Sequence, residues 1–436
     1  MDKGDWRYIG CIMGRRAYKN DPQVKRENKQ INQKINNAIM KRVLYLTIIA
    51  SMALLSCKES APKLTQGIWR ASLMTQDSVE IPFVFEVRMA ENDTIFDIIT
   101  GDYRYEVKDI KVTDDSLFVN MPLFSSSFKI LLTKNGMQGN LIRSAYTMPF
   151  KAESNNSARF KEVHSIKGVA AGRWQITLGE KELIGEFEEN EDRVTGSFLS
   201  PSGDYRFFEG VVNKDGKLMM SCFDGGFIRL FVADIDGDTL RNIKMHSGFS
   251  TVEEGTGFRN ESAALPDAYS VTGLKKGYTS LGFTFPDTDG NPVSLSDERF
   301  KDKITVVQIS GSWCPNCLDE SRFLMEMLEK YSAHMEVICL SFERSDDFET
   351  AKKEAMKLVN VAGITYPVLI TGHTPANVKV ALPELDNFRA FPTSLIIDKK
   401  GKVRKIHSGF TGPGTGVHYR NFVTEFTSFV DSLIAE

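Results

Sequence analysis

From Gly67 to about Gly248 the chain consists of short runs in which apolar and polar residues alternate. Clear examples are IPFVFEV (81–87), SLFVNM (116–121), SFKILL (127–132), GEFEE (185–189) and FIRLFVA (227–233). A period of two is typical of strands with one buried face. Asn-Gly or Asp-Gly pairs at 135–136, 215–216 and 236–237 suit tight hairpins. The pattern predicts an antiparallel, all-β region.

This β region contains an internal repeat. Gly101–Arg104 reads Gly-Asp-Tyr-Arg, and the same four residues recur 102 positions later at Gly203–Arg206. Trp69 has its counterpart in Trp174, 105 positions later. A repeat of this length is too long for a solenoid unit, so we expect a duplicated small barrel or sandwich with one tryptophan plugging each copy. The predicted copies are residues 66–160 and 161–250.

From Ile304 the pattern changes to strands that alternate with helices. Strands are predicted at 304–310, 336–343, 394–398 and 402–410, and helices at 318–335, 346–362 and 418–434. This order predicts a mixed sheet covered by helices, in an α/β domain over residues 278–436. Residues 251–277 are rich in Gly, Glu and Lys and are interpreted as a linker.

The chain begins with a different kind of segment. Thirteen uncharged residues, Val43–Leu55, follow Lys41 and Arg42, as in a secretory signal. The run ends in Leu-Leu-Ser-Cys, which is similar to a bacterial lipobox with Cys57 as the lipidated residue. We therefore expect a leader at 1–56, with Met40 as a possible true start, and a tether at 57–65. At about 1.5 Å per residue the run is too short to span a bilayer, so the prediction is a lipid-anchored protein.

Charge and composition narrow the function. The chain has 54 basic and 57 acidic residues, but eleven of the basic and only four of the acidic ones precede Val43. The remainder is acidic, which excludes a basic field for nucleic acid. Six cysteines in 436 residues are too few for a disulfide-stapled scaffold. Cys222 and Cys339 lie in strand-like apolar runs and are expected in the core.

Cys314 and Cys317 carry the candidate chemistry. They form a Cys-Pro-Asn-Cys motif between the predicted strand 304–310 and the helix that follows. Two cysteines at a helix start can close a small disulfide ring, and backbone N–H groups there favour a thiolate. We expect Cys314 to be the more exposed, attacking sulfur and Cys317 to resolve the mixed disulfide. A zinc site would need a second ligand pair, which the sequence lacks, so no metal or cofactor is expected.

Residues 279–436 resemble the thioredoxin-like TlpA/ResA group of membrane-anchored thiol-disulfide oxidoreductases. The matching pieces are FTFPDTDGNPVSL (283–295), WCPNC (313–317), Glu320 and FPTSLIID with KKGKV (391–403). Because it carries an N-terminal β region, the chain is similar to lipoproteins of Bacteroidetes-like bacteria. Departures from the family pattern are Ser310 for an aromatic residue, Arg322 for proline, and Phe391 before the second conserved proline.

The resemblance implies roles for four further residues. Pro392 would be a cis-proline facing the dithiol, and Phe391 before it would pair with a substrate strand beside Cys314. Trp313 would pack beside the disulfide. Glu320 would lie below Cys317 and exchange its proton, whereas a surface glutamate in the first helical turn is the alternative.

The sequence therefore predicts a lipid-anchored thiol-disulfide oxidoreductase that faces the periplasm and acts on protein disulfides of the envelope. The Pro-Asn dipeptide lacks the histidine that helps stabilise the thiolate of strong oxidants, which favours a reductant supplied by a membrane electron donor. One alternative is a thiol peroxidase of the peroxiredoxin type, although its Pro-x-x-x-Thr-x-x-Cys pocket is missing. Another is a binding lipoprotein in which the β region is the functional part.

Overall fold

The computed structural model describes residues 22–54, 63–90, 93–161 and 166–436, and the chain forms two compact units, Met1–Ala61 and Pro62–Glu436. In the first unit, helix α1 runs from Pro22 to Leu54, so the apolar run from Val43 onward forms its last turns. Within the described ranges, none of the helices is both long enough and apolar enough to cross a membrane. The proposed lipidation site, Cys57, lies outside the described residues.

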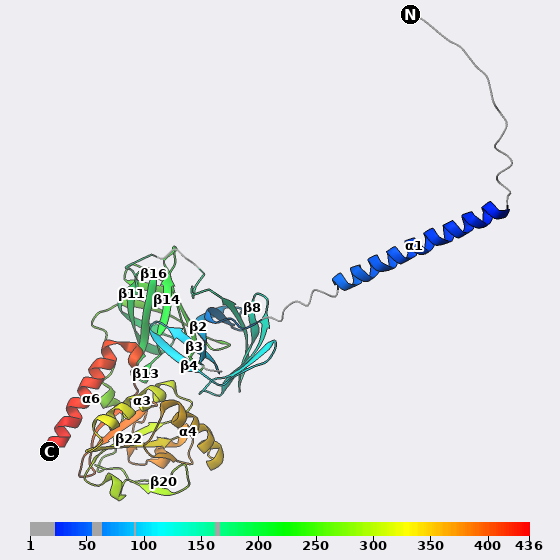
Figure 1. The fold of residues 1–436 in the computed structure, drawn as a ribbon. Coiled ribbons are helices and arrows are strands. Elements are labelled where there is room, and N and C mark those ends of the chain that lie inside the picture. The colour runs from blue at the N-terminus through cyan, green and yellow to red at the C-terminus, as the bar shows by residue number, and fades with distance from the viewer. Residues whose placement is uncertain (1–21, 55–62, 91–92, 162–165) are drawn as a thin grey trace, which may run out of the picture. The chain divides into compact units, whose positions relative to one another are not determined.

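The first repeat is a sheet of nine antiparallel strands in the order β4-β3-β2-β1-β9-β8-β7-β6-β5 (Figure 1). These strands are β1 Gly67–Met74, β2 Glu80–Ala90, β3 Asp93–Thr100, β4 Tyr103–Val107, β5 Ile110–Val112, β6 Ser116–Asn120, β7 Ser126–Thr133, β8 Gly136–Arg143 and β9 Thr147–Ser154. A tight turn joins β7 to β8 as predicted, but its two residues are Lys134 and Asn135, because Thr133 already pairs with Gly136, the first residue of β8. β4 and β5 form the two ends of this sheet.

The second repeat is a closed barrel. Its strands are β10 Gly172–Leu178, β11 Lys181–Asn190, β12 Arg193–Ser200, β13 Gly203–Asp204, β14 Phe208–Val212, β15 Lys217–Phe223, β16 Ile228–Asp236, β17 Thr239–Ser247 and β18 Thr251–Arg259. An additional pairing of β11 with β12 joins the two ends of the sheet. The predicted linker is therefore shorter than expected. Residues 251–259 read as linker because of their glycines and glutamates, but they form β18, which pairs with β10 and β17.

The two tryptophans confirm the duplication. Trp69 and Trp174 are 3% and 0% exposed. The indole N–H of Trp69 donates to the carbonyl of Thr65 at 3.0 Å, and that of Trp174 donates to the carbonyl of Ala170 at 2.7 Å. Each ring therefore satisfies its one donor on the carbonyl four residues earlier, as a buried indole must. Each copy therefore buries its tryptophan with the same local hydrogen bond.

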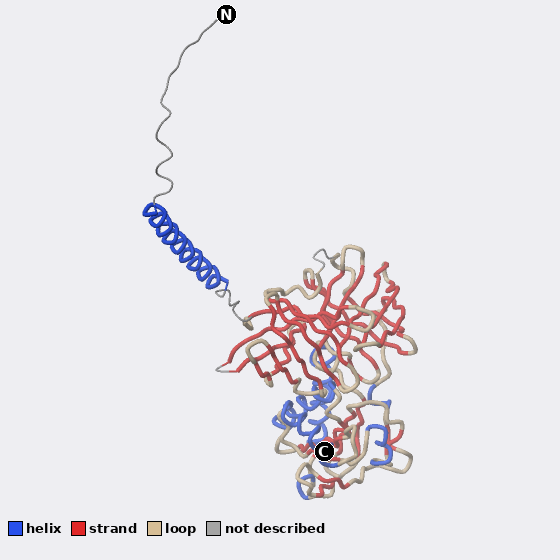
Figure 2. Tube along the Cα trace, turned by 90° about the vertical axis from the view of Figure 1, so that its right-hand side faces the viewer, coloured by secondary structure: helices blue, strands red, loops and turns tan. Residues whose placement is uncertain are grey.

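The C-terminal domain is α/β with a five-stranded mixed sheet in the order β24-β23-β22-β26-β27. Its main strands are β22 Ile304–Ser310, β23 Met335–Ser341, β24 Val368–Ile370, β26 Thr393–Ile397 and β27 Val403–Ser408, and its long helices are α3 Pro315–Lys330, α4 Phe348–Ala362 and α6 Val417–Ala435. Short elements are α2 Ala268–Val271, β19 Gly273–Leu274, β20 Thr284–Pro286, β21 Pro292–Ser294, α5 Val378–Ala381 and β25 Leu385–Asp386. Helices are confined almost entirely to this domain and α1 (Figure 2). The predicted fold class, all-β followed by thioredoxin-like α/β, is confirmed.

Helix α3 positions the candidate chemistry. β22 is buried along its whole length and pairs with β23 on one side and β26 on the other, so it lies at the centre of the sheet. The chain leaves β22 at Ser310, turns, and enters α3 with Cys314 as N-cap and Pro315 in the first turn. Proline suits this place because the first helical N–H groups have no intrahelical partner. The helix begins three residues earlier than its apolar periodicity predicts.

Candidate active site at the start of α3

The two cysteines of the motif lie side by side at the start of α3 as free thiols. The backbone N–H of Cys317 donates to the sulfur of Cys314 at 3.3 Å, and the Cys314 thiol donates to the carbonyl of Phe391 at 3.5 Å. Cys314 is 6% exposed and Cys317 is 0% exposed. The expectation that Cys314 is the more accessible sulfur is confirmed.

Burial changes the expectation for the second sulfur. The helix N-terminus predicts an easily formed thiolate at both cysteines, yet full burial raises the pKa of Cys317 well above its ordinary value, and the neighbouring Cys314 raises it further. A backbone N–H contribution from Gly311 lowers it less than burial raises it. Cys317 therefore needs a proton acceptor before it can act as a nucleophile.

A buried carboxyl lies one helical turn beyond Cys317. Glu320 is 1% exposed and accepts hydrogen bonds from the Gln308 amide at 2.9 Å and the Ser394 hydroxyl at 2.8 Å. Burial raises the pKa of Glu320 to about 7, and these two hydrogen bonds offset part of that rise. The Gln308 amide also reaches the backbone carbonyl of Cys317 at 3.5 Å. Glu320 is a buried titratable group near neutral pH, so the alternative of a surface glutamate is wrong.

An aromatic face borders Cys314. The Phe391–Pro392 peptide is cis, as expected from the resemblance. The ring of Phe391 lies 5.0 Å from that of Trp313 and 5.2 Å from that of Phe388, centroid to centroid. The Trp313 indole N–H donates to the carbonyl of Phe342 at 2.9 Å, which fixes the ring. The structure thus brings Trp313, Phe391 and Pro392 together beside the sulfur.

A second buried carboxyl holds the turn before Cys314. Glu343 is 2% exposed and accepts from the Ser312 N–H at 2.9 Å, the Ser312 hydroxyl at 2.7 Å and the Ser341 hydroxyl at 2.8 Å. Burial raises its pKa. With these three donors, Glu343 orders the turn from which the dithiol projects.

Sequence reasoning missed Gln308, Ser394 and Glu343. A signal for Gln308 was present, because it is the one amide in the apolar run Ile304–Ser310, where a buried polar side chain needs partners. Its amide oxygen accepts from Ser321 and Tyr366 at 3.2 and 3.3 Å. No local pattern marks the contact of Ser394 with Glu320 or that of Glu343 with Ser312, because these partners are 74 and 31 positions apart.

The remaining described cysteines are core residues, as expected. Cys222 and Cys339 are 2% and 0% exposed. Burial raises the pKa of Cys222 to about 12 and raises that of Cys339 as well. Both thiols are therefore shielded from exchange chemistry.

A dithiol at the strand–turn–helix corner of a five-stranded mixed sheet defines a thioredoxin-like protein. The family described as Redoxin matches residues 275–417. The thiol-disulfide oxidoreductase ResA of Bacillus thuringiensis (strain Al Hakam) is 30% identical over 131 residues, which cover 30% of this chain and 68% of the relative. The thioredoxin-like protein YneN of Bacillus subtilis (strain 168) is 24% identical, over 31% of this chain and 74% of the relative.

By this similarity the chain belongs to the family of the ResA thiol-disulfide oxidoreductases, through its C-terminal third. A putative thiol:disulfide interchange protein DsbE from Chlorobium tepidum, known by its crystal structure, is also similar. It is 24% identical over 35% of this chain and 98% of its own, with a TM-score of 0.27.

Proposed function

We propose that this oxidoreductase is a lipid-anchored protein-disulfide reductase of the cell envelope, and that Cys314 and Cys317 are its redox centre. The observation that carries the proposal is the dithiol itself. Cys314 lies at the helix start beside an aromatic face, and Cys317 lies one turn deeper above a buried carboxyl. A nucleophile at the helix start, paired with a resolving thiol that is fully buried, is the arrangement that disulfide exchange requires.

In the proposed reaction the Cys314 thiolate attacks one sulfur of a substrate disulfide. A bond forms between Cys314 and that sulfur, and the other substrate sulfur leaves as a thiolate. Cys317 then loses its proton and attacks the sulfur of Cys314, which releases the second substrate thiolate and leaves a Cys314–Cys317 disulfide. The substrate gains two electrons and the enzyme loses two, so a membrane electron donor must reduce the enzyme again.

Glu320 is the proposed acceptor for the Cys317 proton. Its pKa of about 7 lets it hold or release a proton near neutral pH. Gln308 donates to Glu320 and also reaches the Cys317 carbonyl, so it keeps the carboxyl close to the turn that carries the thiol. Trp313, Phe391 and Pro392 would bind the substrate segment beside Cys314.

Cys57 is the proposed lipid anchor, on the strength of the lipobox-like sequence before it. Cys57→Ala should release the protein from membranes and leave disulfide exchange in vitro unchanged. Sedimentation with membranes measures the first effect. A variant that still sediments with membranes would show that the anchor lies elsewhere.

The direction of electron flow is tested by a redox titration of the Cys314–Cys317 pair. A reductant should have a midpoint well below that of the oxidising periplasmic enzymes, which is about −120 mV. A midpoint close to that value would overturn the reductase proposal and leave an oxidase.

The decisive experiment traps the substrate. Cys317→Ser removes the resolving step, so a mixed disulfide through Cys314 should accumulate and can be captured from cells. Cys314→Ser is the matched control, and it should trap far less because Cys317 is fully buried. Equal trapping by both variants would contradict the assignment of roles. If neither variant traps a partner but the protein consumes peroxide, the thiol peroxidase becomes the better proposal.

A further inference from the structure

The two residues between the cysteines are covered by the β region. The side-chain amide of Asn316 donates to the backbone carbonyl of Asp204 at 3.0 Å and to that of Phe410 at 3.4 Å. Gly203 lies so close that a Cβ atom there would be 2.5 Å from the Asn316 nitrogen and 2.6 Å from the Phe410 oxygen. The second copy of the repeated motif therefore lies directly against the Cys-Pro-Asn-Cys turn.

Pro315 is covered from the same side. A Cβ atom at Gly226, in the loop between β15 and β16, would be 2.9 Å from the Pro315 ring. The same position would be 2.9 Å from the Phe124 ring of the first repeat. Both copies thus contribute to the surface that closes the α3 side of the dithiol.

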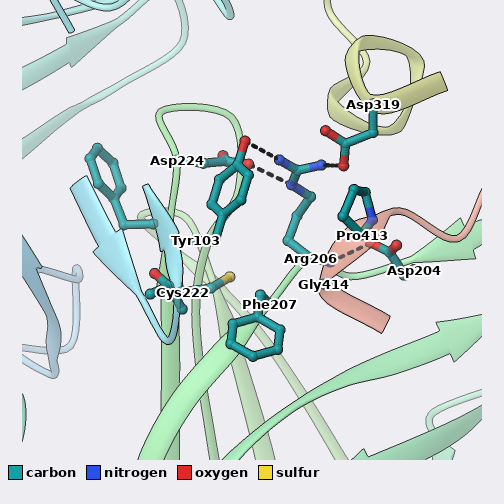
Figure 3. Close-up of a pocket in the computed structure, with 11 residues that line it drawn as sticks. Tyr103, Asp204, Arg206, Phe207, Cys222, Asp224, Asp319, Pro413 and Gly414 are labelled. Carbon is teal, nitrogen blue, oxygen red and sulfur yellow. Dashed lines mark hydrogen bonds and ion pairs between the residues drawn. The ribbon is translucent and has the colours of Figure 1, made fainter. Parts of the chain in front are cut away.

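A buried charge cluster holds this cover in place (Figure 3). The Arg206 guanidinium forms ion pairs with Asp319 of α3 and, at 2.9 Å, with Asp224. It also donates to the hydroxyl of Tyr103, from the first copy of the motif, at 3.3 Å. Arg322, the departure from the family pattern, donates to the same hydroxyl at 3.4 Å. Every one of these side chains except Arg322 and Tyr103 is less than 9% exposed.

The loop is fixed to the C-terminal domain at a third place. The carboxylate of Asp204 accepts the backbone N–H of Gly412 at 2.6 Å, and the Asp204 N–H donates to the carbonyl of Phe410 at 3.2 Å. Backbone, side chain and ion pair therefore all tie Gly203–Arg206, here called the second-copy loop, to the surroundings of the dithiol.

The aromatic face beside Cys314 is partly exposed, whereas Cys314 itself is buried. Trp313, Phe388 and Phe391 are all half-buried, and the exposed Arg344 lies over the Trp313 ring at 5.8 Å. With the α3 side closed, a substrate sulfur can approach Cys314 only across this aromatic face. That approach suits a narrow, extended segment with apolar side chains.

We propose that the second-copy loop is a specificity-determining wall of the substrate site, which admits disulfides in extended, flexible segments and excludes those held in folded proteins. This proposal rests on the proposed disulfide exchange at Cys314. The duplicated β region then has a defined role, because it narrows the substrates that the dithiol can reach.

The test compares two substrates with the full-length protein. One is a flexible linear peptide with a disulfide flanked by apolar residues, and the other is insulin, whose disulfides lie in a folded protein. The double variant Arg206→Gln with Asp319→Asn removes the ion pair between the loop and α3, and it leaves Asp224 as the carboxylate that loses its cation. We expect the rate with insulin, relative to that with the peptide, to rise about tenfold in this variant.

Glu209→Gln is the matched control. It removes the carboxylate that lies 3.6 Å from the buried Arg159 within the β region, away from the dithiol. Its ratio of rates should equal that of the unmodified protein. An unchanged ratio in the double variant, or an equal rise in the control, would overturn the proposal. Failure of the unmodified protein to reduce the peptide at all would instead overturn the proposed function.

A measurement on the unmodified protein covers the case in which the double variant does not fold. Cys314 is labelled with iodoacetamide or with a bulky maleimide, and the labelled residue is located by mass spectrometry. The unfolded chain gives the reference ratio between the rates of the bulky and the small reagent. In the native protein this ratio should be at least about tenfold lower. Equal discrimination in the native and unfolded chains would contradict a wall beside Cys314.

Discussion

The two copies of the Gly-Asp-Tyr-Arg motif have the same sequence and different surroundings. In the first copy Asp102 and Arg104 are exposed, and Arg104 pairs with Glu86 at the surface. In the second copy Asp204 and Arg206 are 4% and 8% exposed, and Arg206 pairs with two buried carboxylates. The difference comes from α3, which lies over the second copy. The backbone differs as well, because Gly101 and Asp102 form a turn whereas Gly203 and Asp204 form β13. The same four residues therefore take their conformation and their burial from the surrounding fold.

The two arginines give the largest expected contrast. Arg206→Ala should lower the free energy of unfolding by about 3–5 kcal/mol, because it leaves buried carboxylates without their cation. Arg104→Ala should lower it by less than about 1 kcal/mol, since its pair with Glu86 is exposed. Urea denaturation of the two variants measures both values. Equal losses would show that burial of the second copy does not contribute to the free energy of unfolding.

The two aspartates should differ in their effect on the pH dependence of stability. Burial raises the pKa of Asp204 to about 6, from an ordinary value of 3.8. The folded state then binds a proton more tightly than the unfolded state, so stability falls as the pH rises from about 4 to 6. Asp204→Asn should remove up to about 3 kcal/mol of this fall, and Asp102→Asn, at the exposed position of the first copy, is the matched control. Thermal melts of the two variants across this pH range measure the effect. Parallel curves of stability against pH for the two variants would refute it.

Substitutions at the two glycines should differ less in their effect on the free energy of unfolding. Gly203 has φ +116°, outside the left-handed helical region, and faces Asn316 and a backbone carbonyl. Gly101 has φ +58°, which other residues tolerate at moderate cost, and faces the ring of Phe207. We expect Gly203→Ala to cost about 2 kcal/mol and Gly101→Ala about 1 kcal/mol in unfolding free energy. The reverse order would mean that Phe207 is held more rigidly than the second-copy loop.

Glu320 sharpens the comparison because it is buried like Asp204. Glu320 accepts hydrogen bonds from a side-chain amide and a hydroxyl, whereas Asp204 accepts from two backbone N–H groups. Above about pH 7 its charge should disfavour a thiolate nearby. Glu320→Gln should therefore shift the pH dependence of thiol alkylation to lower pH, by less than about one unit, or about 1.4 kcal/mol. Superimposable curves for the two proteins would show that Glu320 does not communicate with the dithiol.

Much of the fold was predictable because its signals are local. The alternating runs, the Asn-Gly and Asp-Gly turns and the repeated motif predict the β region, and the β-branched run 304–310 coincides with β22. Residues 251–259 were not recognised as a strand, because Thr251–Arg259 is rich in glycine and glutamate and its partners β10 and β17 supply the pairing. Composition of the segment alone carries no information about those partners.

The site was predictable in its chemistry and less so in its surroundings. Cys314, Cys317 and Pro392 follow from motifs and a family resemblance. The hydrogen bond from Ser394 to Glu320 and the cover formed by Asp204 and Arg206 depend on residues more than 70 positions apart. Such contacts are set by tertiary packing, which leaves no periodicity or spacing in a single sequence.

The two ends of the first sheet have a consequence for its contacts with other chains. A free sheet edge can pair with an unpaired strand of another chain and seed aggregation. The second repeat has joined its ends through β11 and β12, whereas the first sheet still ends in β4 and β5. β4 carries Arg104 and Glu106 and β5 is only three residues long, with an exposed Lys111. Charge and brevity thus protect both ends of the first sheet against pairing with a strand of another chain.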